Sequence, residues 1–236
     1  MGTRPSLLLL TWLGLTATGL VVLLSGLRAS RVERQTARPV QEEPEASPYP
    51  ALPPPSPRQV REALERVFGD VLAGERQKAV FCVADLNGDG SEDLAAAAKP
   101  RANRLKEINA PFANWTIQDA EHPPSRLGDP TPRRPEVMRG DGLLAVIHGE
   151  GASGWRDREA RQAYLVRNGA SLACQVRRPQ ELAALSTPGA RLPRIVGDVL
   201  LQTGPSPGRF LYWTGARYLW HSPGPAAAGG ATAPHG

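Results

Sequence analysis

An acidic loop with regular spacing is the strongest sign of chemistry in this chain. Residues 85–94 read DLNGDGSEDL, in which acidic and amide side chains recur beside two glycines, Gly88 and Gly90, that let the chain take positive φ values and fold tightly round a centre. The ligand-type residues at loop positions 1, 3, 5, 7 and 9 are Asp85, Asn87, Asp89, Ser91 and Asp93, the serine through its backbone carbonyl. Calcium binds about 6–8 oxygen ligands of these kinds. The pattern therefore predicts a calcium site, whose ion offsets the repulsion among neighbouring aspartates.

Two other structures begin with the same residues. An EF-hand starts in this way, but it needs a glutamate at position 12 and a helix on each side. Position 12 is Ala96, and the apolar runs that flank the loop indicate strands, so the sequence excludes an EF-hand. The alternative that stays open is a metal-free turn, in which Asp and Asn side chains cap the backbone between two strands.

The loop and its flanks, residues 80–98, read VFCVADLNGDGSEDLAAAA and resemble the calcium loop of FG-GAP and VCBS repeats. The hallmark of that family is D-x-N-G-D-G-x-x-D-L between two short strands. The resemblance implies that Asp85, Asn87, Asp89 and Asp93 bind calcium through their side chains. The family repeats this loop round a propeller, whereas this chain has one copy, so we expect a blade-like sheet within a small domain. The chain thus looks like a bacterial membrane-anchored protein with a single calcium loop.

A strand-like run followed by glycines raises the possibility of hydrolysis. His148, Gly149 and Gly151 follow the apolar run 143–147, as in the oxyanion-hole segment of lipase-like hydrolases. The matching nucleophile motif G-x-S-x-G fails around Ser153, because a tryptophan stands in the place of the last glycine. A glycine-rich turn is therefore favoured, and an envelope hydrolase that uses His148 is the alternative.

Aromatic residues near the C-terminus suggest a third function. They are Tyr212, Trp213, Tyr218 and Trp220, on two predicted strands that form a hairpin. Packing in the core is the commoner use of such side chains. The alternative is a platform that binds carbohydrate, as in an adhesion module.

The elements that must position these residues indicate a mainly β domain. A capping-box pattern at Ser56 and Gln59 predicts an amphipathic helix over residues 57–72, ended by Gly74. Strands are predicted at 79–84, 94–98, 114–118, 143–147, 163–166, 172–176, 195–201, 210–213 and 217–220, with a turn at Gly169 and a short helix at 179–185. The expected fold class is α+β, mainly β, with a small antiparallel sheet and one N-terminal amphipathic helix. The only cysteines, Cys82 and Cys174, fit either one disulfide bond or two buried thiols.

Four segments are predicted along the chain. Residues 1–30 form a signal anchor or transmembrane helix, because residues 6–27 carry no charge and about 20 apolar residues span a bilayer. Residues 31–56 form a proline-rich linker that is extended and semi-rigid. Residues 57–221 form the globular domain, and residues 222–236 form a disordered tail rich in Gly, Ala and Pro.

The charge pattern bears on partners. The net charge is +5, but the arginines are interleaved with acids, as in residues 156–159, and no basic run is paired with stacking aromatics. We therefore expect no nucleic-acid partner. The expected partners are the membrane, through residues 6–27, and a protein or glycan.

Two arguments on membrane orientation conflict. The arginines after the apolar segment are Arg28, Arg31, Arg34 and Arg38, and the positive-inside rule places such residues in the cytoplasm. A calcium loop with a Kd of about 10⁻⁴–10⁻³ M would be filled only outside the cell. We give the second argument more weight. The sequence therefore predicts an exported, membrane-anchored, non-enzymatic domain with a structural calcium loop, which mediates binding or surface interaction.

Overall fold

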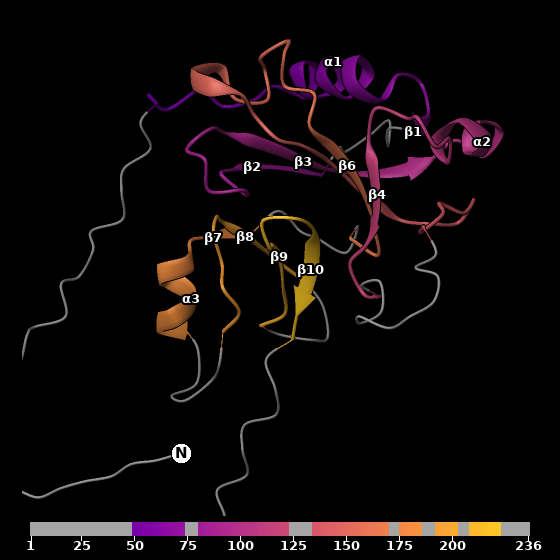
Figure 1. Cartoon of the computed structure of the whole chain (residues 1–236). Helices are drawn as coiled ribbons and strands as arrows, with labels where there is room; N and C mark the ends of the chain where they lie inside the picture. Colours follow the sequence, from indigo (N-terminus) through magenta and orange to yellow (C-terminus); the bar gives the residue numbers. More distant parts are fainter. Residues whose placement is uncertain are drawn as a thin grey trace, which may run out of the picture. The chain divides into compact units, whose positions relative to one another are not determined.

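A six-stranded sheet organises the computed structural model of this chain (Figure 1). The structure describes residues 49–73, 80–122, 134–169, 175–185, 192–202 and 208–222, with the backbone alone for 183–185. All of them belong to the compact unit Ala46–Gly236. The predicted membrane segment 6–27 and most of the tail lie outside the described residues. Within the described ranges, no helix has the length and apolar character that crossing a bilayer requires.

The first helix confirms the capping box and corrects the predicted helix end. Helix α1 spans Pro57–Phe68, with the Ser56 side chain accepting from the Gln59 N–H and the Gln59 side chain accepting from the Ser56 N–H. It ends at Gly69, which takes a φ of +62°. The expected end at Gly74 was therefore wrong, because the first glycine able to adopt a left-handed conformation ended the helix earlier.

The first sheet is larger than predicted. Its strands are β1 (Leu72–Ala73), β2 (Phe81–Ala84), β3 (Asp93–Pro100), β4 (Thr116–Asp119), β5 (Leu143–Ile147) and β6 (Ala163–Arg167). The order is β1-β3-β5-β6-β4, and β2 pairs with β3 beside the same path. All pairs are antiparallel except β4 with β6, so an entirely antiparallel sheet was wrong. β4 and β6 are separated in sequence by β5, and a long connection of this kind permits parallel pairing, which a tight hairpin forbids.

A second, antiparallel sheet follows. Its strands, in the order β10-β9-β8-β7, are β7 (Val176–Arg177), β8 (Val199–Leu201), β9 (Phe210–Trp213) and β10 (Tyr218–His221). Helix α3 (Pro179–Leu185) confirms the predicted short helix, while α2 (Leu105–Ile108), η1 (Ala102–Arg104) and η2 (Gly151–Ser153) were not predicted. The fold is α+β and mainly β, as expected, but it is built from two sheets.

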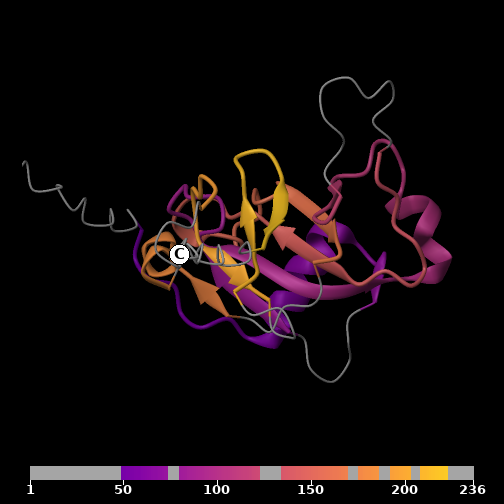
Figure 2. The same cartoon turned by 90° about the horizontal axis from the view of Figure 1, so that it is seen from below.

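Alternation along the strands of the first sheet creates two cores. Leu94, Ile147 and Leu165 belong to the cluster that also holds Val60 and Phe68 of α1. Their sequence neighbours point to the other face, because successive strand residues alternate. That face packs on the second sheet, and its buried residues include Ala95, Val146, Tyr164, Leu211, Trp213 and Tyr218. Seen from below, the β9–β10 hairpin lies over the first sheet (Figure 2).

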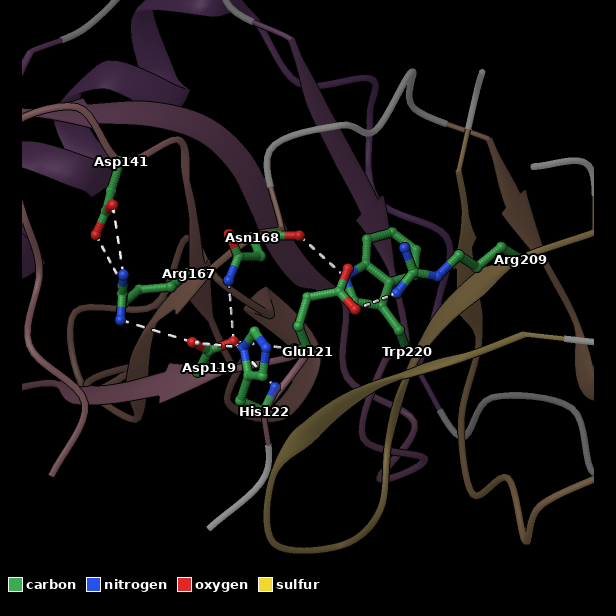
Figure 3. Close-up of polar contacts among 8 residues, drawn as sticks. All are labelled: Asp119, Glu121, His122, Asp141, Arg167, Asn168, Arg209 and Trp220. Carbon is green, nitrogen blue, oxygen red and sulfur yellow. Dashed lines mark hydrogen bonds and ion pairs between the residues drawn. The ribbon is translucent and has the colours of Figure 1, made fainter. Parts of the chain in front are cut away.

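Polar contacts join the edge of the first sheet to the second (Figure 3). Arg167 of β6 pairs with Asp141, at 2.7 Å, and with Asp119 of β4, at 3.6 Å. The Trp220 indole N–H donates to the Asn168 carbonyl at 2.9 Å. The Arg209 guanidinium lies 4.7 Å from the centre of the Trp220 ring and pairs with Glu121, which follows β4. These contacts fix the β9–β10 hairpin against the end of β4.

One cysteine lies among the described residues. Cys82, on β2, is disulfide-bonded, so the alternative of a buried free thiol is wrong at this position. The chain has one other cysteine, Cys174, which lies outside the described residues.

Candidate functional site

The acidic loop connects β2 to β3 as predicted. Ala84 and Asp93 are paired across the two strands, so the loop begins and ends at neighbouring points of the sheet. Gly88 and Gly90 have φ values of +76° and +86°. Both glycines therefore adopt the left-handed conformation that the tight curvature needs.

Backbone N–H groups surround the first carboxylate of the loop. The Asp85 carboxylate accepts from the N–H groups of Gly88 at 2.8 Å, Asp89 at 3.1 Å and Gly90 at 2.9 Å. The Asp89 carboxylate in turn accepts from the Ser91 N–H at 2.8 Å. These are local bonds of the Asx-turn type, so the side chains of the loop determine its backbone.

Three of the predicted ligand side chains lie together. The Asp89 backbone nitrogen lies 3.1 Å from both Asp85 Oδ1 and Asn87 Oδ1, so these two oxygens share one N–H donor. The Asn87 amide nitrogen lies 2.8 Å from Asp89 Oδ2. Each carboxylate has about four lone-pair positions, of which these bonds leave at least one on Asp85 and two on Asp89.

Within the described part of the chain, the loop aspartates have no cationic side chain as a partner. Among the described residues, the carboxylates of Asp85, Asp89 and Asp93 form no ion pair with lysine, arginine or histidine. Nor does the described part of the chain bring three His, Cys, Asp or Glu side chains together in a group able to hold a metal ion. The oxygens that do lie together come from two aspartates and an asparagine, which are calcium donors in kind.

Asp93 differs from the rest of the loop, because it is buried. Its side chain is 0% exposed, and it bonds to three backbone N–H groups: Leu86 at 2.8 Å, Asn87 at 3.2 Å and Gly149 at 2.7 Å. Burial raises the pKa of Asp93 to about 8, the N–H groups of Gly149 and Leu86 oppose this shift, and the charges of Asp89 and Asp85 add to it. Asp93, near the end of the loop, thus bonds through one carboxyl group both to the start of the loop and to the turn at Gly149.

Asp85, which is half-buried, shows the same unfavourable electrostatics as Asp93 in milder form. Burial raises the pKa of Asp85 and the charge of Asp89 adds to the rise, while its backbone donors lower it. A cation near these oxygens would remove the repulsion between the two carboxylates.

A segment far along the sequence supports the loop. A Cβ on Gly88 would lie 2.1 Å from the Val196 carbonyl oxygen, and one on Gly197 would lie 2.5 Å from the Leu86 carbonyl oxygen. The Asp198 N–H donates to the Asp85 carbonyl at 2.7 Å. Sequence reasoning missed this support, because a single glycine before a strand gives no signal of which loop it will contact.

The glycines after β5 pack against the end of the acidic loop. A Cβ on Gly149 would lie 2.3 Å from the Glu92 carbonyl oxygen, and one on Gly154 would lie 2.5 Å from the same atom. The Trp155 N–H donates to that oxygen at 2.8 Å. The Gly149 N–H, which an oxyanion hole would need, is already bonded to Asp93. The geometry accounts for these glycines by close packing, as a glycine-rich turn after a strand.

His148 lies in the core between the sheets. Its side chain is 1% exposed, and its ring neighbours those of Tyr164, Trp213 and Tyr218 at centroid separations of 4.9–5.9 Å. Nε2 lies 2.8 Å from the Tyr218 hydroxyl, whereas Nδ1 has no hydrogen-bond partner among the described residues. Burial lowers the pKa of His148 to about 4, so the ring is neutral at pH 7. A general base must reach its substrate, and this buried ring faces aromatic side chains instead.

The C-terminal aromatics divide between core and surface. Trp213 is 6% exposed and Tyr218 is 1% exposed, and both pack with Tyr164. Tyr212 and Trp220 are half-buried, and Trp220 lies under the Arg209 guanidinium. The four side chains therefore do not form one exposed platform in this structure.

A cavity beside the acidic loop brings in the end of the proline-rich segment. It has a volume of about 240 Å³ and is lined by loop residues such as Asp85 and Ser91, by Gly151 and Ala152, and by residues 49–52. Arg156 pairs with Glu92 and donates to the Pro53 carbonyl at 2.7 Å. The last residues before α1 are thus attached to the domain next to the loop.

The functional evidence comes from the geometry alone. Comparison of the chain with protein-family models, with curated proteins and with solved structures gives no match.

Proposed function

We propose that the loop at residues 85–93 binds one calcium ion and that the ion's role is structural. The observation that carries the proposal is the group of carboxylates that no cationic side chain of the described residues neutralises, set on a loop whose glycines hold them together. The proposed ligands are Asp85, Asn87, Asp89, the Ser91 carbonyl and Asp93, with water to complete the shell. Asp93, whose pKa burial raises to about 8, would bind in its ionised form, which the charge of the ion favours, through the lone-pair position that its three backbone donors leave open.

The ion would act as a clamp at a junction of several segments. The loop contacts residues 196–198 on one side and the turn at Gly149 on the other. Through Glu92 and Arg156 it also connects to Pro53, at the end of the linker. Calcium binding would therefore hold together the segment that joins the domain to its linker, and its binding free energy would add to the stability of the fold.

The expected affinity of the site for calcium bears on where the domain lies in the cell. We propose that residues 6–27 anchor the chain in a membrane and that the domain lies on the extracytoplasmic face, where calcium is abundant. The linker would present the domain to a protein or glycan partner as a binding module without catalytic activity. A reporter fused after Gly236 tests the orientation: activity on the cytoplasmic side would contradict export.

The calcium site is tested by thermal unfolding with and without the ion. For a Kd of about 10⁻⁴–10⁻³ M, calcium at about 5 mM should stabilise the fold by about 1–2 kcal/mol. For a domain of about 150–250 residues this corresponds to a rise in Tm of about 2–8 °C. Identical melting curves in chelator and in calcium, with no ion found by direct binding, would refute the proposal.

A pair of charge-matched variants localises the effect. Asp89→Ala should abolish the calcium-dependent rise in Tm, because it removes an exposed ligand whose side-chain hydrogen bonds stay within the loop. Glu136→Ala removes the same charge from an exposed position elsewhere and should keep the full rise. An unchanged rise in Asp89→Ala would place calcium at another site.

A further inference from the structure

A second candidate site lies away from the acidic loop and has the opposite charge. It is a groove of about 660 Å³ lined by Arg66, Val67, Asn114, Arg158 and Arg161. Arg66 and Val67 belong to the last turn of α1, Asn114 precedes β4, and the other two arginines belong to the segment before β6. Two segments distant in sequence thus bring three arginines to one groove, a third segment adds Asn114, and the described lining contains no acidic residue.

The arginines of this groove are only weakly paired within the protein. Arg66 donates to the carbonyls of Trp155 at 2.8 Å and Arg156 at 3.3 Å, which fixes the side chain but leaves its charge without a carboxylate. Arg158 forms no hydrogen bond or ion pair within the described residues. Arg161 has one ion pair there, with Glu159 at 3.8 Å, and both side chains are more than 70% exposed. Exposed pairs at such distances contribute little.

The electrostatic consequence is visible at Arg66. Partial burial lowers the pKa of Arg66, and the charges of Arg158 and Arg161 lower it further, while Asp157 opposes them. Holding three positive charges close together costs electrostatic free energy, and a bound ligand of opposite charge would offset this cost. An anionic ligand would do so, because a guanidinium binds a phosphate oxygen pair in a bidentate manner.

We propose that this groove binds a phosphate group carried on a small organic molecule or on a lipid headgroup. Arg66 is the anchored donor, Arg158 and Arg161 close on the phosphate oxygens, and Asn114 adds an amide donor from the same lining. The volume lies within the range of about 300–1,000 Å³ typical of small-molecule sites, so the groove accommodates more than a bare phosphate. Val67 offers an apolar surface for the rest of the molecule. The proposal does not depend on calcium.

Calorimetric titration of the full chain in a mild non-ionic detergent tests the site. Three probes separate the sources of phosphate: inorganic phosphate, glycerol 3-phosphate, and a short-chain phosphatidic acid kept below its micelle concentration. Arg158→Gln and Arg161→Gln should each weaken binding about five- to tenfold, because each removes one guanidinium from the phosphate. Arg194→Gln is the control, since it makes the same charge change at an exposed position outside the groove.

The outcomes are distinct. Binding of glycerol 3-phosphate that is lost in the groove variants and kept in the control supports a soluble phosphomonoester. Binding of the phosphatidic acid alone, with the same dependence on the arginines, supports a lipid headgroup. No binding of any probe overturns the proposal, as does binding of inorganic phosphate alone, and so does equal weakening in Arg194→Gln, which would reduce the effect to net charge.

Discussion

Gly149→Ala tests whether the turn after β5 is a packing device for the acidic loop. The new Cβ would lie 2.3 Å from the Glu92 carbonyl oxygen and 2.8 Å and 2.9 Å from two backbone atoms of Gly154. An ordinary contact needs at least about 3.4 Å, so backbone on one side must move by about 1 Å. The Cβ meets backbone on both sides, and no flexible side chain can yield instead.

The movement has a calculable effect on two hydrogen bonds. If residue 149 moves away from Glu92, the hydrogen bond from the residue 149 N–H to the Asp93 carboxyl group, now 2.7 Å long, is stretched. The hydrogen bond from the Trp155 N–H to the Glu92 carbonyl, now 2.8 Å long, is stretched as well. Each buried polar group left unpaired costs about 1–3 kcal/mol. We therefore expect Gly149→Ala to lower the free energy of unfolding by about 2–5 kcal/mol.

Urea unfolding followed by tryptophan fluorescence measures this, because Trp155 is 1% exposed and adjoins the turn. Gly151→Ala is the matched control in the same turn. Gly151 has a φ of +53°, and a Cβ placed there would meet no described atom within 4 Å, so alanine should cost only about 1–2 kcal/mol of backbone strain. If both variants lose the same stability, close packing against the loop is not what the glycine at 149 provides.

Two further predictions concern the contacts between the sheets. His148 has a folded-state pKa of about 4 against an ordinary value of 6.5, so the native state binds fewer protons and its stability falls as the pH drops from about 6.5 to about 4. Between pH 7 and pH 4.5 the wild type should lose about 2–3 kcal/mol more than His148→Phe, measured by urea unfolding at each pH; parallel losses would contradict a buried neutral ring. Arg209→Ala removes the ion pair with Glu121 and the contact with Trp220, and should lower the free energy of unfolding by about 1–2 kcal/mol. Arg58→Ala, which breaks an exposed pair on α1, should leave the free energy of unfolding almost unchanged, and a similar loss in both variants would deny the Arg209 contacts a role between the sheets.

Local patterns in the sequence were sufficient where the structure is decided locally. The capping box at Ser56 predicted the start of α1, and the aromatic runs around Thr214 and Gly215 predicted the β9–β10 hairpin. The glycines at 88 and 90 predicted the positive φ values of the acidic loop. In each case the determining hydrogen bonds join residues a few positions apart, so the sequence window contains both partners.

Tertiary structure decided the features whose partners are distant. The parallel pairing of β4 with β6, the burial of Asp93 against Gly149 and the approach of Gly197 to Leu86 all join segments separated by other elements. The same holds for the groove arginines, which look like solvated surface charge in the sequence. The sequence shows that these positions carry small or charged residues. Only the folded chain determined which of them meet, because a contact between distant segments depends on the packing of everything that lies between them.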